Sequence, residues 1–268
     1  MNYRTTPISS MKDAFSVKSY NVVITGGNRG IGLGISTAYA QSGANVAILC
    51  RDRKKGEQAV EELKQYGTTC FCVSCDVSRH ESVKAASEEV FKVFPTLDVL
   101  VNNSGISAVS EFLNDKDLEG WHRVIDTNLH GPAYMIYEFV PSMIKAGKGG
   151  SVINISSTGG QALGGARTHP MPGYHASKAA LDMFTRNMAI EFGDYGIRVN
   201  GIAPGPTHSD LDKDLPADAL EKFDQLMPMH RFGEPIEIGA LCVFLSSKAG
   251  NQITGTIVVH DGGLLQIS

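Results

Sequence analysis

The chain has 268 residues, of which 42% are hydrophobic, and its 24 basic and 28 acidic side chains give a formal net charge of −4. This balance, without long runs of one sign, gives no support for binding to nucleic acids or to membrane surfaces. No apolar stretch reaches the roughly eighteen residues of a membrane span, and the opening segment 1–18 lacks the apolar core of a signal peptide. We therefore expect a cytoplasmic protein that begins with a polar, mobile extension.

Short β-branched runs alternate with longer amphipathic stretches along the rest of the chain. The runs predict strands at 21–25, 45–50, 70–75, 97–102, 151–156, 197–202 and 256–260. The amphipathic stretches predict helices near 31–42, 54–66, 79–93, 115–146, 174–191 and 235–246. Because most of the runs are apolar on both faces, helices must cover the sheet on each side. The sequence thus predicts one α/β domain over 19–268, a Rossmann-like, doubly wound parallel sheet of about seven strands.

The five cysteines fit this pattern better than a metal site or a disulfide framework. An odd number of cysteines without a secretion signal argues against disulfides. In the segment 70–75, CFCVSC, Cys70 and Cys72 alternate with apolar residues as along one face of a strand. No second pair of ligands follows at the spacing of a zinc site, so we expect a buried strand and no metal.

One segment breaks the alternation of strands and helices. Residues 206–234 are polar and contain prolines, with space for one short helix. A connection of this length is usually a lid or a binding loop. Its mixture of apolar and acidic side chains fits an apolar ketone and a polyol equally well as substrate.

The segment 22–34, VVITGGNRGIGLG, joins the first predicted strand to the first long helix. Gly26, Gly30 and Gly32 allow a tight turn and a close approach of the backbone to a pyrophosphate. The free N–H groups and the positive dipole end of the helix suit the same anion. We therefore expect this loop to bind a dinucleotide.

The end of the second predicted strand decides which dinucleotide fits. A site for NAD carries an acid there that binds the ribose 2′-hydroxyl, but here the strand is followed by Arg51 and Asp52. Together with Arg29 of the glycine-rich loop, Arg51 could bind a 2′-phosphate in bidentate fashion. We favour NADP(H), with NAD(H) left open because Asp52 could turn inward.

Tyr174 and Lys178, in the segment PGYHASKAAL, are four residues apart and share one face of a predicted helix. A free phenol has a pKa of about 10, too high for ready proton exchange at neutral pH. A fixed ammonium about 4 Å away could supply about 4 kcal/mol toward lowering it. Tyr174 then becomes a usable general acid or base, although such pairs also occur by chance on many helices.

Two further polar groups lie where they could assist this pair. Ser156 and Ser157 end the fifth predicted strand, and either hydroxyl could orient a substrate oxygen. Asn128 lies inside a long predicted helix, where a buried amide is unfavourable unless it forms hydrogen bonds. Asn128 therefore either serves a proton path or is a satisfied core amide.

From about residue 18 onward, the chain resembles the short-chain dehydrogenase/reductase family. The matching motifs, in order, are TGGNRGIG (25–32), CDVS (75–78), NNSG (102–105), TN (127–128), SS (156–157), YHASK (174–178) and PGPTHS (204–209). Each motif is weak alone, but the ordered set is specific. The match departs from the usual pattern at Ser104, where alanine is usual, and in a longer stretch between Ser157 and Tyr174.

The resemblance implies a catalytic tetrad of Asn128, Ser157, Tyr174 and Lys178. Tyr174 would be the acid/base, and Ser157 rather than Ser156 would orient the carbonyl or hydroxyl group. Lys178 would bind the nicotinamide ribose and lower the pKa of Tyr174, and Asn128 would hold a water molecule that links Lys178 to solvent.

The resemblance also implies a set of cofactor contacts. Beside Tyr174 and Lys178, these are Gly26, Gly27, Asn28, Arg29, Gly30, Ile31, Gly32, Arg51, Asp76, Val77, Asn103, Thr207 and Ser209. Cys50 occupies the position at which NAD-using members carry an acid. Family members are usually homotetramers, in which the helices near 115–146 and 174–191 pack against symmetry mates.

These observations lead to a principal hypothesis, an NADP(H)-dependent oxidoreductase that interconverts a small-molecule ketone and a secondary alcohol. The second hypothesis is an NAD-linked polyol, sugar or hydroxysteroid dehydrogenase, which relative rates with the two cofactors would distinguish. The third is a dinucleotide-binding sensor without activity, for which loss of a tetrad residue is expected; all four are present.

Overall fold

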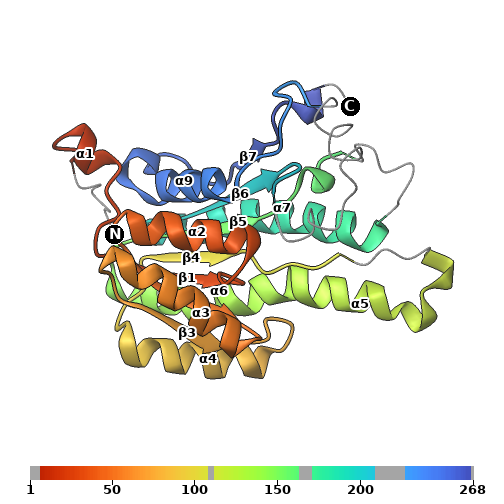
Figure 1. Ribbon diagram of the computed structural model, residues 1–268, viewed down its shortest axis with the longest axis horizontal. Coiled ribbons are helices and arrows are strands. Elements are labelled where there is room, and N and C mark those ends of the chain that lie inside the picture. Colours follow the sequence, from red (N-terminus) through yellow and green to blue (C-terminus); the bar gives the residue numbers. More distant parts are fainter. Residues whose placement is uncertain (1–6, 108–111, 163–170, 209–226, 267–268) are drawn as a thin grey trace.

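A parallel sheet forms the centre of the molecule in the computed structural model, which describes residues 7–107, 112–162, 171–208 and 227–266 (Figure 1). Within these residues the sheet has seven strands in the order β3-β2-β1-β4-β5-β6-β7. The strands are β1 (Asn21–Thr25), β2 (Asn45–Cys50), β3 (Cys70–Ser74), β4 (Val99–Asn102), β5 (Gly150–Ile155), β6 (Ile197–Pro204) and β7 (Ile257–His260). The predicted doubly wound parallel sheet is confirmed.

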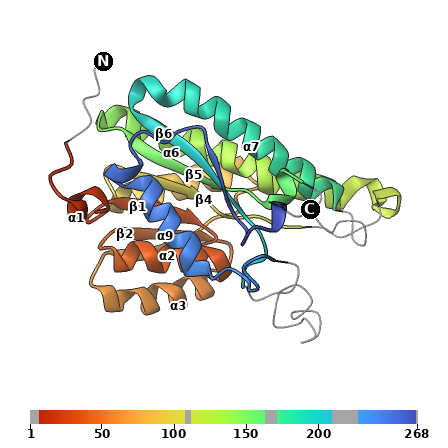
Figure 2. The same ribbon diagram turned by 90° about the horizontal axis from the view of Figure 1, so that it is seen from above.

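Helices cover both faces of the sheet (Figure 2). One face carries α2 (Gly30–Gln41), α3 (Arg53–Leu63) and α9 (Pro235–Ser246), and the other carries α4 (His80–Val93), α6 (Gly131–Ala146) and α7 (Pro172–Phe192). Alternate strand residues face the two layers: Val22 and Ile24 pack under α2, whereas Val23 packs under α4 and α6. The expectation of strands apolar on both faces is confirmed for β1.

The sheet changes direction of winding next to its first strand. β1 pairs with β2 on one side and with β4 on the other, so the connections after β1 and after β4 leave toward opposite faces. In open parallel sheets, ligands bind in the crevice at the carboxyl ends of the strands at such a point. The segments that follow β1, β4 and β5 therefore define where a site should lie.

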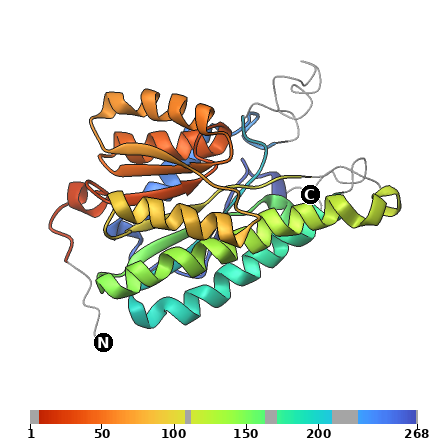
Figure 3. The same cartoon turned by 90° about the horizontal axis from the view of Figure 1, so that it is seen from below.

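The helix predicted near 115–146 is divided. It consists of α5 (Glu119–Ile125), a π-helical turn (Asp126–His130) and α6, which lie beside α7 (Figure 3). The Asp115 carboxylate caps α5 by accepting hydrogen bonds from the backbone N–H groups of Gly120 and Trp121. π-Helical turns are rare and often occur at functional sites, and this one contains Asn128.

The two ends of the predicted lid meet at the carboxyl end of β6. Thr207 and Gly233 form an isolated parallel bridge, and Gly233 N donates to Pro206 O at 3.0 Å. Residues 209–226 of the predicted lid lie outside the described residues. Its remaining ends are thus held together beside the sheet.

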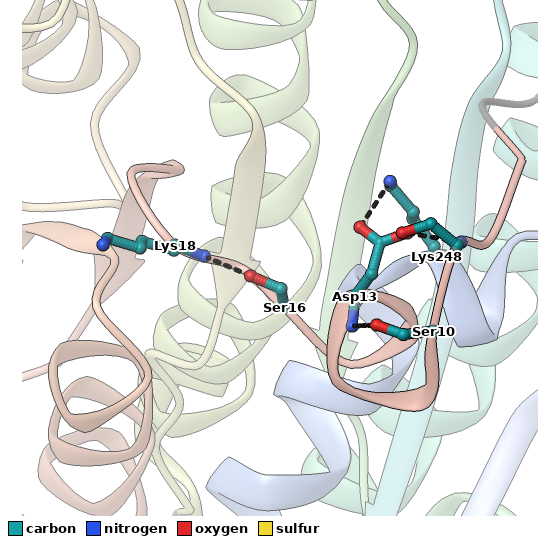
Figure 4. A network of polar contacts seen from close by, with 6 residues as sticks. Ser10, Asp13, Ser16, Lys18 and Lys248 are labelled. Carbon is teal, nitrogen blue, oxygen red and sulfur yellow. Dashed lines mark hydrogen bonds and ion pairs between the residues drawn. The ribbon is translucent and has the colours of Figure 1, made fainter.

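The opening segment, which the sequence predicts to be a mobile extension, makes contacts with α9 and Lys248 in its described part. Ser10 caps the short helix α1 (Met11–Ala14), and Asp13 forms an ion pair with Lys248 at 2.7 Å (Figure 4). Ala14 and Val17 are buried, and the Phe15 ring lies 6.1 Å from that of Phe244 on α9. Burial of a few apolar side chains holds an otherwise polar segment in place.

Within the described residues, no helix combines the length and the apolar character needed to cross a bilayer. The cysteines in those residues are all free thiols.

Candidate active site

Glycines close the turn between β1 and α2. Gly26 has a φ of +65°, and its N–H donates to Leu49 O at 2.7 Å. A Cβ on Gly32 would lie 2.1 Å from the Gly26 carbonyl oxygen, so only glycine lets the helix begin this close to the turn. Arg29 is the N-cap of α2 and provides no side-chain hydrogen bond to it. The first N–H groups of α2 therefore lack a side-chain cap, which suits an anion.

The other residues predicted for this loop belong to the same turn. Gly27 is buried, Asn28 and Gly30 are partly exposed, and Ile31 packs against the core beneath α2.

Asn103 ties the end of β4 to the end of β1. Its side-chain Nδ2 donates to Thr25 O at 2.9 Å, and its backbone N–H donates to Thr25 Oγ1 at 2.9 Å. The N–H of Ser104 donates to the same hydroxyl at 2.9 Å. These bonds fix the floor of the crevice between the glycine-rich loop and the segment after β4.

The end of β2 presents arginine rather than acid. Asp52 turns away, because its carboxylate caps α3 by accepting from Lys55 N at 3.1 Å. The Cys50 thiol is buried and donates to Asp52 O. Arg29 and Arg51 are exposed, and within the described part of the chain neither pairs with an acidic group.

The predicted adenine and nicotinamide contacts lie at the ends of β3 and β6. Asp76 accepts hydrogen bonds from Ser78, and the buried Val77 packs against Gly131 at the start of α6. Thr207 is held by its bond to Gly205 O at 3.1 Å. Ser209 lies outside the described residues. The roles of these residues toward a cofactor stay predictions.

Tyr174, Ser157 and Lys178 converge at the carboxyl end of β5. Tyr174 lies in the first turn of α7, and the side chain of Ser157 acts on its phenol by lowering its pKa. Ser157 also caps the short 3₁₀ turn 158–160 by accepting from Gly159 N at 3.0 Å. Lys178 is buried, its Nζ donates to Ile155 O at 2.8 Å, and it lies 5.8 Å from the centroid of the Tyr174 ring.

The electrostatics of this pair differ from the sequence-based expectation. Within the chain alone, burial raises the pKa of the Tyr174 phenol, and the hydrogen bond with Ser157 opposes the rise. Burial also lowers the pKa of Lys178 to about 8, against the attraction of Asp182. The expected lowering of the Tyr174 pKa by Lys178 is thus not present in the chain by itself, where removal from water is the largest influence on the phenol.

Asn128 is fully buried and clamps the segment after β4. Its Oδ1 accepts from Ile106 N at 2.9 Å, and its Nδ2 donates both to Ile106 O at 2.9 Å and to Ser177 Oγ at 3.0 Å. Within the chain, Asn128 is therefore a satisfied core amide, one of the two readings that the sequence left open. The other reading, a role in a proton path, stays a prediction.

Two neighbouring residues were not predicted as parts of the site. Gly105 lies beside both side chains: a Cβ on it would lie 3.4 Å from Asn128 Oδ1 and from Lys178 Nζ. Ser177 joins Asn128 to α7 through its own bond to Tyr174 O at 2.7 Å. Both belong to motifs noted in the sequence, NNSG and YHASK, but only the fold shows these contacts.

Replacing Lys178 by Met should change how stability depends on pH. Lys178 titrates near 8 in the folded chain and near 10.5 when unfolded, so the unfolded chain binds more protons between these values. The free energy of unfolding of the wild type should therefore rise relative to Lys178→Met by about 3 kcal/mol from pH 8 to pH 10.5. Urea unfolding of both chains without nucleotide tests this, and a constant difference across that range would contradict it.

Comparisons with known proteins agree with this geometry. A sequence model of the family described as "Enoyl-(Acyl carrier protein) reductase" matches residues 26–265. The chain is 35% identical over 246 residues to the 3-oxoacyl-[acyl-carrier-protein] reductase of Staphylococcus epidermidis, covering 91% of this chain and 98% of that protein.

Two solved structures share the whole fold. A short-chain type dehydrogenase/reductase from Mycobacterium marinum has a TM-score of 0.89 and 30% identity over 95% of this chain and 99% of that one. A gluconate 5-dehydrogenase from Burkholderia cenocepacia, solved with NADP and tartrate, has a TM-score of 0.87 and 30% identity over 97% and 100%. The chain belongs to the short-chain dehydrogenase/reductase family of oxidoreductases.

Proposed function

We propose that the protein is an NADP(H)-dependent alcohol dehydrogenase/carbonyl reductase, which interconverts a small-molecule ketone and a secondary alcohol with Tyr174 as acid/base. The observation that carries the proposal is the convergence of Tyr174, Ser157 and Lys178 at the carboxyl end of β5. The glycine-rich turn and the uncapped start of α2 lie at the carboxyl end of β1 in the same sheet.

The residues of the crevice fit a dinucleotide. Gly26 and Gly32 leave a cradle that side chains would fill, and α2 presents N–H groups without a side-chain cap. The pyrophosphate would bind there, with Asn103, Asp76 and Val77 nearby at the ends of β4 and β3.

The choice of NADP(H) rests on the end of β2. The carboxylate of Asp52 accepts a hydrogen bond at the start of α3, and Cys50 stands where an acid would bind a ribose 2′-hydroxyl. Arg51 and Arg29 are exposed guanidinium groups that suit a 2′-phosphate. The related gluconate 5-dehydrogenase binds NADP, which supports this choice.

The bound cofactor would supply or accept a hydride at the carbonyl carbon. Tyr174 would donate a proton to the carbonyl oxygen in reduction and remove it in oxidation, while Ser157 would hold the same oxygen. The Lys178 ammonium would bind ribose hydroxyls and favour the phenolate form of Tyr174. Asn128 would keep Ile106 and Ser177 in place around Lys178.

Tyr174→Phe should reduce kcat by about 10²–10⁴-fold, because it removes the acid/base and little else. The affinity for NADPH, measured by fluorescence titration, should stay within about twofold. The substrate for this assay is first identified by screening a panel of ketones, sugars and steroids. The screen measures NADPH consumption and is repeated with NADH. The exposed Tyr195 provides the matched control, Tyr195→Phe. Full activity of Tyr174→Phe would refute the assignment.

Arg51→Ala should weaken NADPH binding by about ten- to a hundredfold, the range expected for loss of a charged hydrogen bond, and should leave NADH binding unchanged. Arg53→Ala serves as the control, because Arg53 is nearby but pairs with Glu57. Equal losses for both nucleotides would count against a 2′-phosphate site. Wild-type preference for NADH would favour the alternative, an NAD-linked polyol, sugar or hydroxysteroid dehydrogenase.

We also propose that the protein is a homotetramer. Apolar side chains are exposed on two neighbouring helices, Tyr137 on α6 and Met183 and Ile190 on α7. Covering such side chains with a second copy would remove them from water.

In light scattering, the wild type should show the mass of four chains, and Ile190→Asp should show a smaller species. Met11→Asp, which changes another exposed apolar residue on α1, should leave the mass unchanged. A monomeric wild type would overturn the proposal.

A further inference from the structure

Asp182 is a buried carboxylate directly behind the catalytic pair. It lies one turn beyond Lys178 on α7, so the two residues share a face of the helix. Its exposed fraction is 4%, equal to that of Lys178. Its Oδ1 is buried without a hydrogen-bond partner within the described part of the chain. A buried carboxylate is unfavourable unless charges or hydrogen bonds compensate it, so its position requires a reason.

The groups around Asp182 come from both elements that carry the site. Ser156 at the end of β5 and Gln161 after the 3₁₀ turn 158–160 act on its carboxyl by lowering its pKa, and Arg186 and Lys178 of α7 attract it electrostatically. These four are the polar or charged groups that act on it among the described residues.

The turn that follows Ser157 is packed directly on the helix. A Cβ on Gly160 would lie 2.8 Å from the backbone carbon of Lys178 and 3.0 Å from Ala179 N. Ser156 Oγ also lies 3.4 Å from Lys178 O. Asp182 therefore interacts with residues on either side of Ser157, and it does so from the helix that carries Tyr174.

Lys178 has few other compensating groups. Its Nζ bonds to the Ile155 carbonyl oxygen, a neutral acceptor. Burial lowers the pKa of Lys178, and the charge of Asp182 raises it. A Lys178 without this neighbour would lose its proton at lower pH.

We propose that Asp182 is a positioning residue that keeps Lys178 charged and fastens the Ser157 turn to α7. The proposal rests on the proposed function, because the charge of Lys178 matters for binding the cofactor. Without the Asp182 carboxylate, Lys178 would lose its charge at a lower pH than in the wild type. The cofactor ribose would then lose its cationic partner at that lower pH.

The test is the pH dependence of NADPH affinity, measured by fluorescence or calorimetric titration between pH 7 and 10. Wild-type affinity should begin to fall near pH 8, where Lys178 loses its proton. Asp182→Asn keeps the shape but removes the charge, and its midpoint should lie about one pH unit lower. Asp182→Glu should restore the midpoint, and Asp194→Asn, at an exposed acid after α7, should not move it. Asp182→Ser provides a second variant without the carboxylate charge if Asp182→Asn is unstable.

Superimposable pH profiles of the wild type and the charge-free variants would overturn the inference, even if those variants unfold more easily, since a purely structural role changes stability without moving the midpoint. Failure of the proposed function would look different: the wild type itself would not bind NADPH at any pH.

Discussion

The site depends on one burial, that of the Lys178 ammonium beneath the end of β5. An ammonium group out of water is costly unless acceptors and opposite charge surround it. Here the Ile155 carbonyl accepts one hydrogen bond, Asp182 contributes charge, and Gly105 lies beside Nζ.

The surrounding fold supplies rigidity at the places where Lys178 needs it. Asn128, in its π-helical turn, holds both backbone groups of Ile106 and the hydroxyl of Ser177. A second buried chain of polar side chains links the sheet to α7. Asn102 Nδ2 donates to Asn154 Oδ1 at 2.9 Å, and Asn154 Nδ2 donates to Thr185 Oγ1 at 2.8 Å. Buried hydrogen-bonded networks of this kind fix relative positions closely. The catalytic helix is thereby tied to the sheet on both sides of Lys178.

Much of this architecture was predictable from local patterns. The strand runs and the glycine-rich turn are short-range signals, and the segment YHASK predicts a shared helical face without any knowledge of the fold. The direction of Asp52 was not predictable, because a capping interaction and a ribose contact use the same carboxylate. The pKa of Tyr174 was predicted in the wrong direction for the chain alone, since burial is a property of tertiary packing. The docking of Phe15 was not predicted for a similar reason: its ring partner, Phe244, lies near the other end of the domain in the sequence.

The contact between the opening segment and α9 has a consequence for how the protein is made. Phe15 packs against Phe244 of the last long helix, and Asp13 pairs with Lys248, which follows that helix. On the ribosome, Asp13 and Phe15 emerge long before Phe244 and Lys248, so these contacts cannot form until the later residues have been made. Docking of Asp13 and Phe15 is therefore a late event in synthesis, which follows the emergence of the strands β1 to β6.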